Sequence, residues 1–208
     1  MKGKRNPFVA REGFPWLILV AAMFGLLLRY ADPVYLIIPV LLFIWLLAIF
    51  RDPRRIIPAI PLGLVSPVDG TVIEVGLTDH SVLGGEAHRI VIQIDSFGTY
   101  TARCPVEGKI MDFRGDGEHE AVRKLSSGLW IRTDEGDDVV LQFKCHRFGL
   151  APLAFLRFGE RIGQGQRCAY LRLTKIAELQ FPIHGRMLVE TGQRVVAGCD
   201  VLGKLPPH

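Results

Sequence analysis

The sequence predicts a mainly β protein, a barrel or sandwich of short strands, preceded by an α-helical membrane hairpin. Two apolar runs, residues 15–28 and 34–50, come before Arg51. After Arg55, short alternating runs are separated by turns rich in Gly and Pro, with no long helical pattern. The chain has 49% hydrophobic residues and a mean hydropathy of +0.27, more than a soluble domain of 208 residues requires. We therefore expect a membrane hairpin over residues 1–55 and a β domain over residues 56–208.

The hairpin is predicted from the two apolar runs and the break between them, Arg29-Tyr30-Ala31-Asp32-Pro33. Each run is slightly short for a perpendicular span, which needs about 20 residues. Two short spans and one re-entrant hairpin both fit this length. A cleaved signal peptide is disfavoured, because no small-residue cleavage site follows the first run and a second apolar run comes directly after it.

The charge distribution favours a membrane surface over a nucleic acid as the partner. The net charge is +4, and the basic residues cluster at both outer ends of the hairpin, at Lys2, Lys4, Arg5 and Arg11 and again at Arg51, Arg54 and Arg55. By the positive-inside tendency, we expect an inner-membrane protein whose N-terminus and β domain face the cytoplasm. The four cysteines are far apart, without CxxC or zinc-ligand spacing, which predicts reduced, buried thiols and no metal site.

The stretch from Phe50 to Val72 marks the change from hairpin to β domain. Its arginines, Arg51, Arg54 and Arg55, can snorkel towards anionic head groups, and a purely topological anchor explains them equally well. Four prolines then prevent a continuing helix, at Pro53, Pro58, Pro61 and Pro67. Asp69 follows in a tight turn before a strand-like run, so this carboxylate is a candidate site group.

The β domain repeats a short phrase that reads as a turn feeding a strand. The phrase occurs as PVDGTV at residues 67–72, PVEGKI at 105–110 and PIHGRM at 182–187. A second Gly-bounded phrase, typical of a hairpin turn, occurs at residues 159–166 and 192–198. Further strands are expected over residues 71–75, 89–94, 129–133, 139–144 and 168–181, and a helical turn or two over residues 151–158.

The order of apolar hairpin, FRDPRR, SPVDGTV, RCPVEGKI and GERIGQGQR resembles the short form of phosphatidylserine decarboxylase along nearly the whole chain. The resemblance implies a lipoyl-like β hybrid fold and a membrane-anchored enzyme of phosphatidylethanolamine synthesis. In that family a Gly-Ser bond cleaves itself and the Ser becomes a pyruvoyl group, which forms a Schiff base with the substrate amine. An Asp and a His assist the self-cleavage.

The family residues carry over unevenly. Asp69 matches the family Asp, and Arg103 matches the Arg that follows the family His. With Arg51, Arg54 and Arg55, Arg103 is expected to face the lipid head groups or the membrane surface. Tyr100 stands at the His position, and a tyrosine is a poor base at neutral pH. At the cleavage site, Thr174 and Lys175 replace Gly and Ser. Lys175 has no hydroxyl to attack the preceding carbonyl, so no pyruvoyl group and no other cofactor is expected there; the sequence also lacks a phosphate cradle for pyridoxal phosphate.

Another route to a carbonyl group starts from Thr174. Its hydroxyl could attack the Leu173 carbonyl and, after cleavage and elimination, leave a 2-oxobutanoyl group. This route requires a one-residue shift in the turn and proceeds without the family His.

The remaining polar residues favour structural roles. Asp69 is expected to cap its turn. His80, His119 and His184 lie in turn-like or charged contexts, which predicts solvated side chains. His146 lies next to Cys145, and adjacent strand residues point to opposite faces, which argues against a nucleophile–base pair between them.

Three functions follow from these observations. The first is a catalytically silent relative of the decarboxylase that binds an anionic phospholipid head group or regulates a partner. The second is an active decarboxylase with unconventional processing at Thr174. The third is a structural partner of an active paralogue, and a homodimer is also compatible with the family resemblance.

Overall fold

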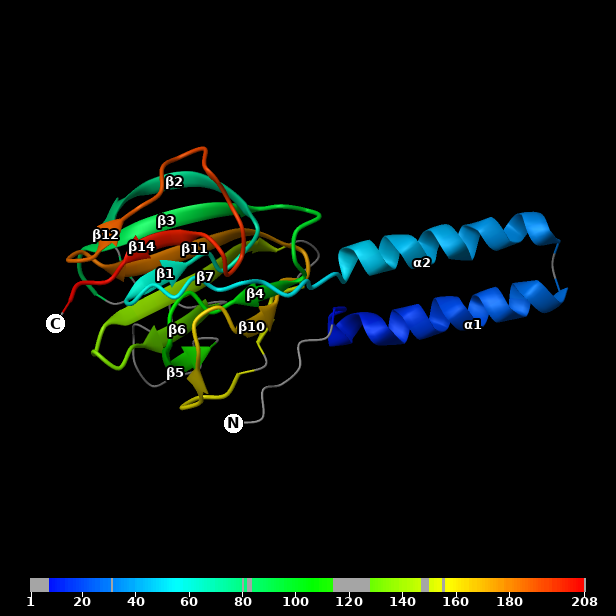
Figure 1. The fold of residues 1–208 in the computed structure, drawn as a ribbon, viewed down its shortest axis with the longest axis horizontal. Coiled ribbons are helices and arrows are strands. Elements are labelled where there is room, and N and C mark those ends of the chain that lie inside the picture. Colours follow the sequence, from blue (N-terminus) through cyan, green and yellow to red (C-terminus); the bar gives the residue numbers. More distant parts are fainter. Residues whose placement is uncertain are drawn as a thin grey trace. The chain divides into compact units, whose positions relative to one another are not determined.

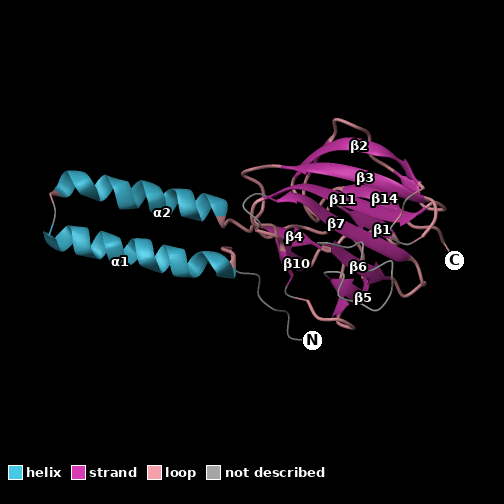
Figure 2. Ribbon diagram, turned by 180° about the vertical axis from the view of Figure 1, so that it is seen from behind, coloured by secondary structure: helices cyan, strands magenta, loops and turns pink. Residues whose placement is uncertain are grey.

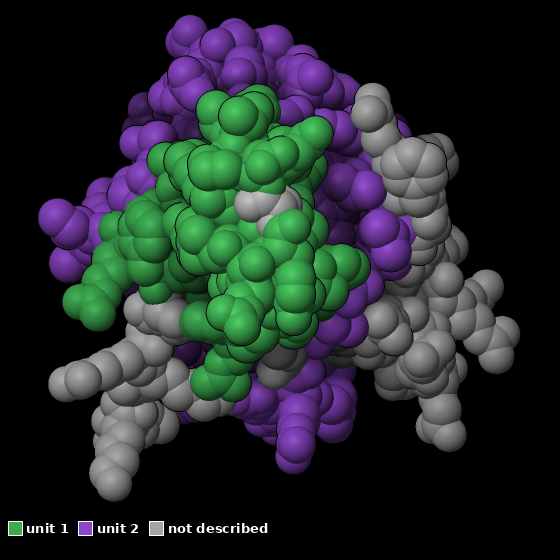
Figure 3. Space-filling model, turned by 90° about the vertical axis from the view of Figure 1, so that its right-hand side faces the viewer, with its two compact units in different colours: residues 1–54, 97–100 green, residues 55–96, 101–208 purple. Residues whose placement is uncertain are grey.

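The computed structural model describes residues 8–30, 32–79, 81, 84–113, 128–146, 150–154 and 156–207. The chain divides into two compact units, which Figure 3 colours green and purple. The first unit contains Met1–Arg54 together with the loop Phe97–Tyr100. The second contains Arg55–Ser96 and Thr101–His208. The chain therefore passes between the units at the peptide bonds 54–55, 96–97 and 100–101.

The first unit is a pair of apolar helices, lying side by side in Figures 1 and 2. A short 3₁₀ turn, η1 (Arg11–Gly13), leads into α1 (Phe14–Tyr30), and a second one, η2 (Pro33–Leu36), leads into α2 (Ile37–Ile49). Most large apolar side chains of both helices are exposed. The segment Arg11–Tyr30 is long and apolar enough to cross a membrane, at about 30 Å for 20 residues, whereas Pro33–Ile49 is shorter. The predicted helical hairpin is confirmed.

The second unit is built from short antiparallel strands, as predicted. Eight of them form one sheet in the order β13-β2-β3-β11-β7-β6-β5-β9, and two smaller sheets have the orders β1-β14-β12 and β4-β10-β8. The described strands are β1 (Gly63–Val65), β2 (Gly70–Thr78), β3 (Ala87–Ile94), β4 (Thr101–Arg103), β5 (Gly108–Phe113), β6 (Gly128–Arg132), β7 (Asp138–His146), β8 (Leu153–Ala154), β9 (Arg161–Ile162), β10 (Arg167–Tyr170), β11 (Thr174–Pro182), β12 (Arg186–Met187), β13 (Arg194–Val195) and β14 (Val201–Lys204).

The smaller sheets share one hydrophobic core with the large sheet. On β11, alternate residues Ala177, Leu179 and Phe181 are fully buried in this core, as period-2 alternation requires. The same cluster contains Leu64 and Leu202 from the β1-β14-β12 sheet and Ala102, Cys168 and Ala169 from the β4-β10-β8 sheet. The sheets therefore form a sandwich, and among the described strands no closed barrel is formed.

The glycine of the repeated phrase has the same physical role in all three copies. A Cβ built on Gly70 would lie 2.1 Å from the carbonyl oxygen of Gln93, and one on Gly108 would lie 2.4 Å from that of Arg132. At Gly185 the corresponding distance, to the Lys204 carbonyl oxygen, is 3.0 Å. In each copy the glycine lets the entering chain approach a neighbouring strand more closely than a side chain would allow.

Two sequence predictions are wrong in detail. The run 168–181 is not one strand, because Arg172 adopts a φ of 52° and the chain turns between β10 and β11. Residues 151–158 were predicted as a helical turn, but the described part contains the short strand β8, which pairs with β10. The Gly-bounded phrases are turns as predicted, with φ positive at Gly159, Gly165, Gly192 and Gly198.

Candidate functional site

One end of the large sheet brings together Asp69, Thr174 and Lys175, three of the residues that the sequence singled out. Because the strands are antiparallel, the start of β2 lies beside the end of β3, where Gly70 pairs with Ile94. The start of β11 lies beside the same end of β3, with Ile176 opposite Gln93, and beside the end of β7, with Thr174 opposite His146. Asp69 and Thr174-Lys175, predicted from separate motifs, are therefore at the same end of the sheet.

Asp69 is held by a cation and a backbone amide. Its side chain is 11% exposed, and Oδ2 lies 2.9 Å from the Arg55 guanidinium. Oδ1 accepts a 2.7 Å hydrogen bond from the Ala197 N–H, 128 positions further along the chain. Asp69 thus ties the start of β2 to the turn after β13, a longer-range role than the predicted capping of its own turn.

Lys175 is close to the same cluster through Ser96. Its Nζ donates a 2.9 Å hydrogen bond to Ser96 Oγ. The neighbouring residue, Asp95, donates its N–H to the Asp69 carbonyl oxygen at 3.0 Å and forms a 2.8 Å ion pair with Arg194. The site therefore combines three cations, Arg55, Lys175 and Arg194, with the carboxylates of Asp69 and Asp95. Sequence reasoning missed both Asp95, which lies outside the repeated phrases, and Arg194, because the Gly-bounded phrase at residues 192–198 was interpreted only as a turn.

Thr174 and His146 form a pair that the sequence did not reveal. They are directly opposite each other on β11 and β7, so their side chains lie on the same face of the sheet. Thr174 is 4% exposed, and its Oγ1 has no hydrogen-bond partner within the described chain. The buried Nδ1 of His146 also lacks a partner there. An imidazole therefore faces the Thr174 hydroxyl across the sheet; it comes from β7 and not from the family His position, which Tyr100 occupies.

The peptide bond before Thr174 lies in a strained turn. The Thr174 N–H donates to the Leu171 carbonyl oxygen at 3.1 Å, closing a turn that contains Arg172 and Leu173. Arg172 adopts the left-handed φ of 52°, which costs a non-glycine residue about 1 kcal/mol or more. Strain of this kind clusters at functional sites, although it can also serve a tight connection.

Arg103 requires a correction. We predicted it to face lipid head groups, but its side chain is only 2% exposed. Its Nη1 donates a 3.0 Å hydrogen bond to the Gly165 carbonyl oxygen. A Cβ built on Gly198 would lie 2.8 Å from Arg103 Cδ, so two turns pack around this arginine. Arg103 therefore supports the fold from inside the second unit.

Tyr100, Arg51 and Arg54 belong to the first unit. The Tyr100 hydroxyl donates to Glu12 Oε2 at 2.8 Å, and its ring lies edge-on to Phe50 with centroids 4.8 Å apart. Arg51 is exposed and donates to the Phe97 carbonyl oxygen at 3.3 Å, and Arg54 is exposed. The residue at the family His position therefore joins the loop Phe97–Tyr100 to the ends of the helices.

The cysteines and remaining histidines show no second site in the described residues. All four thiols are free, and Cys104 and Cys168 are buried as predicted, but Cys145 is exposed. Burial raises the pKa of Cys168 to about 12, so this thiol is unreactive at neutral pH. His184 is exposed, and His80 and His119 lie outside the described residues. No group of three His, Cys, Asp or Glu residues suited to a metal occurs in the part of the chain that is described.

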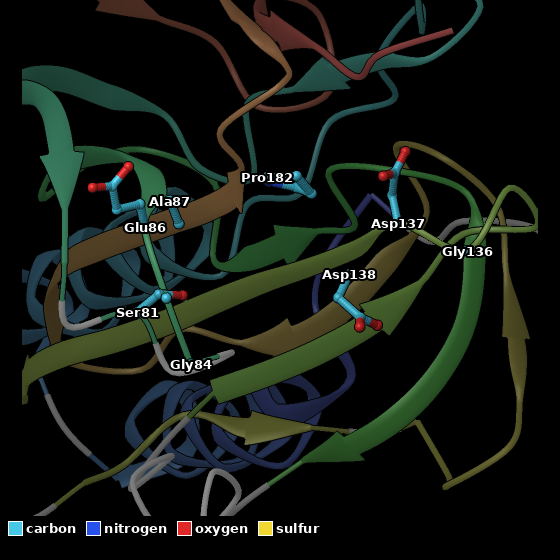
Figure 4. A pocket seen from close by; sticks show the side chains of 9 residues that line it. Ser81, Gly84, Glu86, Ala87, Gly136, Asp137, Asp138 and Pro182 are labelled. Carbon is cyan, nitrogen blue, oxygen red and sulfur yellow. The ribbon is translucent and has the colours of Figure 1, made fainter. Parts of the chain in front are cut away.

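A cavity of about 280 Å³ lies at the opposite end of the large sheet, shown in Figure 4. Ser81, Glu86, Asp137 and Asp138 contribute polar groups to its lining. It adjoins the start of β3 and β7 and the end of β11, so it is separated from Asp69 and Lys175 by the length of the strands, about 30 Å for the nine residues of β7. This cavity is not part of the candidate site.

The fold and the site together define a β-sandwich protein with an N-terminal apolar helix pair and a polar cluster at one sheet end. Comparison with known proteins identifies the family. The phosphatidylserine decarboxylase proenzyme of Burkholderia ambifaria is 30% identical over 214 aligned residues, covering 96% of this chain and 97% of the relative. The enzyme of the same name from Nitrosomonas europaea is 29% identical, with 96% of each chain covered. The chain belongs to the phosphatidylserine decarboxylase family.

No protein-family profile matches the chain. Among solved structures, the glucose permease IIA from Mycoplasma capricolum aligns with 68% of this chain and 94% of its own, at 18% identity and a TM-score of 0.49. Family membership and the apolar helix pair place the protein in phospholipid metabolism and indicate membrane association.

The pyruvoyl group of the family does not fit the residue at its position. A pyruvoyl group forms from a serine side chain, and Lys175 offers an ammonium group that is hydrogen-bonded to Ser96 instead.

Proposed function

We propose that the protein remains in one piece and binds an anionic phospholipid head group at the Asp69–Lys175 end of the sheet. The observation that carries the proposal is Lys175 at the family cleavage position, with Nζ directed at Ser96 Oγ. A lysine ammonium is a compact cation with three donors, suited to a phosphate but unable to undergo the serine self-cleavage.

The charges of the site fit a head group that carries both signs. Lys175 and the arginines Arg55 and Arg194 offer donors to a phosphodiester or carboxylate, and Asp69 and Asp95 offer acceptors to an ammonium group. Phosphatidylserine contains all three groups. Both arginines are already paired with carboxylates, so Lys175, whose partner is a neutral hydroxyl, is the cation most easily transferred to a ligand.

The first test of the proposal is the intact mass of the full-length protein purified in detergent, with and without phenylhydrazine, which traps a reactive carbonyl. We expect a single uncleaved mass and no adduct. The second test is calorimetric titration with water-soluble glycerophosphoserine, where Lys175→Ala should weaken binding about tenfold or more, the loss of one charged hydrogen bond. Lys109→Ala, at an exposed lysine on β5, is the matched control and should bind as the parent does.

A second candidate is self-processing at Thr174, favoured by the facing His146 and the strained turn. His146 would accept the Thr174 hydroxyl proton while Oγ1 attacks the Leu173 carbonyl carbon. The Leu173–Thr174 C–N bond then breaks, giving an ester and a free amine. Loss of the Thr174 α-proton and of the Leu173 carboxylate leaves an enamine, which water converts to a 2-oxobutanoyl group and ammonia.

The same mass measurement distinguishes the two candidates. Self-processing gives two fragments divided between Leu173 and Thr174, with a hydrazone on the smaller one. In that case His146→Gln and Thr174→Val should each leave the chain uncleaved. An uncleaved parent protein removes this candidate, and the head-group titration then tests the first one separately.

A further inference from the structure

The loop Phe97–Tyr100 is fastened to the ends of both helices in the first unit. The Tyr100 N–H donates to the Arg51 carbonyl oxygen at 3.2 Å, and the Arg51 guanidinium donates back to the Phe97 carbonyl oxygen at 3.3 Å. The Tyr100 side chain adds the contacts to Glu12, just before α1, and to Phe50, just after α2. This loop is thus fixed at the end of the pair where α1 begins and α2 ends.

The helix ends themselves are fastened to each other at the same place. Val9 and Arg51 form a β-bridge, and the Ala10 N–H donates to the Phe50 carbonyl oxygen at 2.9 Å. A Cβ built on Gly13 would lie 2.6 Å from the Phe50 ring, so a glycine is needed where the two chains approach. We call this end of the helix pair, where α1 begins and α2 ends, the base of the pair. Backbone contacts already close the base, and the loop Phe97–Tyr100 is attached to it.

Exposed aromatic side chains gather around this base. Phe97 is 67% exposed, and Phe8, Phe14, Trp16 and Trp45 are also exposed there. Along the helix pair, the other exposed aromatic residues are Tyr30 and Tyr35, at the far end of the described helices. Aromatic residues at both ends of an apolar helix pair are typical of the two interfaces of a bilayer. Arg11 and Arg51, both exposed, add cations at the base, where anionic head groups would meet them.

We propose that the loop Phe97–Tyr100 is a third membrane-contacting element, which places the Phe97 ring in the interfacial layer of an anionic bilayer beside Trp16 and Trp45. The proposal rests on the membrane association of the helix pair. It assigns Tyr100 a positioning role, because its ring and hydroxyl hold the loop at the base of the helices. It also gives the β domain a second attachment to lipid, through the peptide bond between Ser96 and Phe97.

The experiment uses full-length protein in which Phe97→Cys carries an environment-sensitive fluorophore. Cys145 and Cys199 are replaced by serine, since the other two thiols are buried. The labelled protein is reconstituted in vesicles of phosphatidylglycerol and phosphatidylcholine that contain a nitroxide lipid quencher near the head group. We expect a blue-shifted emission that the quencher reduces. A label at Glu135→Cys, an exposed turn position at the opposite end of the large sheet from Ser96, should show neither effect.

Three further variants test the positioning role of Tyr100 and the effect of the label. Tyr100→Ala should shift the Phe97 label towards the emission of the Glu135 control, whereas Tyr100→Phe should retain most of the quenching through its ring. Phe97→Trp, in a protein with Trp16→Phe and Trp45→Phe, replaces the label with a native-sized side chain. Brominated lipids should quench its tryptophan fluorescence beyond the level that Trp130 alone gives.

Vesicle flotation separates the proposal from its premise. Protein that does not float with the vesicles contradicts the membrane association of the helix pair. Protein that floats while the Phe97 label stays unquenched and water-like overturns the role of the loop alone. A blue shift that grows with protein concentration and is insensitive to the lipid quencher would instead assign this surface to a second copy of the chain.

Discussion

Glu178 shows how a single buried carboxylate stabilises the second unit. Its side chain is 3% exposed, and Oε2 lies 2.6 Å from Lys144 Nζ while Oε1 lies 3.2 Å from Arg89 Nε. Gln180 adds a 2.7 Å hydrogen bond to Oε1. Burial raises the pKa of this carboxyl, but the hydrogen bonds from Lys144 and Gln180 and the nearby positive charges outweigh it, so the pKa is lowered overall.

The lowered pKa predicts a pH-dependent contribution to stability. Because the folded-state pKa is below the unfolded value of about 4.3, the stabilisation is fully present above that pH and is lost as the pH falls through the folded pKa. Glu178→Gln should lower the free energy of unfolding by about 1–3 kcal/mol at pH 7, and by much less in acid. Chemical denaturation in detergent, at pH 7 and in acid, measures the difference in unfolding free energy between the parent and the variant. The exposed Glu135→Gln is the control, and an equal loss at both pH values would contradict the ionic origin.

Substitutions of Asp69 give a second prediction at the residue scale. It concerns the contribution of the Asp69 contacts to stability, which can be measured separately from any catalytic role. Asp69→Ala removes the acceptors of both Arg55 and the Ala197 N–H and should cost about 1–3 kcal/mol of unfolding free energy. Asp69→Asn retains an acceptor for the Ala197 N–H and should lose less. Unfolding curves of Asp69→Ala, Asp69→Asn and Arg55→Ala test the order; an Asp69→Ala variant as stable as the parent would show that these contacts do not stabilise the unit.

At the scale of the strand, the glycine of the repeated phrase is required for close approach. Gly70→Ala would place its Cβ against the Gln93 carbonyl oxygen, so β2 must shift from β3 at an expected cost of about 1–3 kcal/mol. Gly76→Ala, six residues later on β2, meets nothing within 4 Å and should change stability by less than about 0.5 kcal/mol. Thermal unfolding of the two variants provides the comparison. Equal effects would mean that backbone entropy, not close approach, determines the need for glycine.

Strands could be predicted where they depend on a local pattern of alternating apolar residues. Features that depend on distant parts of the chain, or on one residue's backbone conformation, were missed. Alternation predicted β2, β3, β6 and β7 to within a few residues, because each strand has one face in the core. The break before Thr174 was missed, because a left-handed arginine leaves no signature in the sequence. The pairing of Thr174 with His146 was missed for another reason: register between strands depends on the whole sheet rather than on neighbouring residues.

For the molecule as a whole, the sequence predicted the order of hairpin and β domain and the family. It also singled out Asp69, Tyr100, Thr174 and Lys175 as family site positions. The structure places three of them at one sheet end, whereas Tyr100 belongs to the first unit. It did not predict that the loop Phe97–Tyr100 would cluster with the helices, because that grouping arises from contacts between segments about 50 and 90 positions apart. Arg103 was misassigned because a motif records which residue is present, not how deeply it is buried.

The attachment of Tyr100 to Phe50 and Glu12 has a practical consequence for producing the β domain as a soluble fragment. Removing residues 1–54 strips the aromatic and acidic partners from Tyr100 and leaves its ring beside the exposed Phe97 on a surface loop. Neighbouring exposed aromatics promote self-association. We predict that the fragment 55–208 elutes as oligomers in size-exclusion chromatography with light scattering, and that Phe97→Ser with Tyr100→Ser restores a monomer. Crystallisation or solution studies of the soluble part would therefore begin from this double variant rather than from a simple deletion.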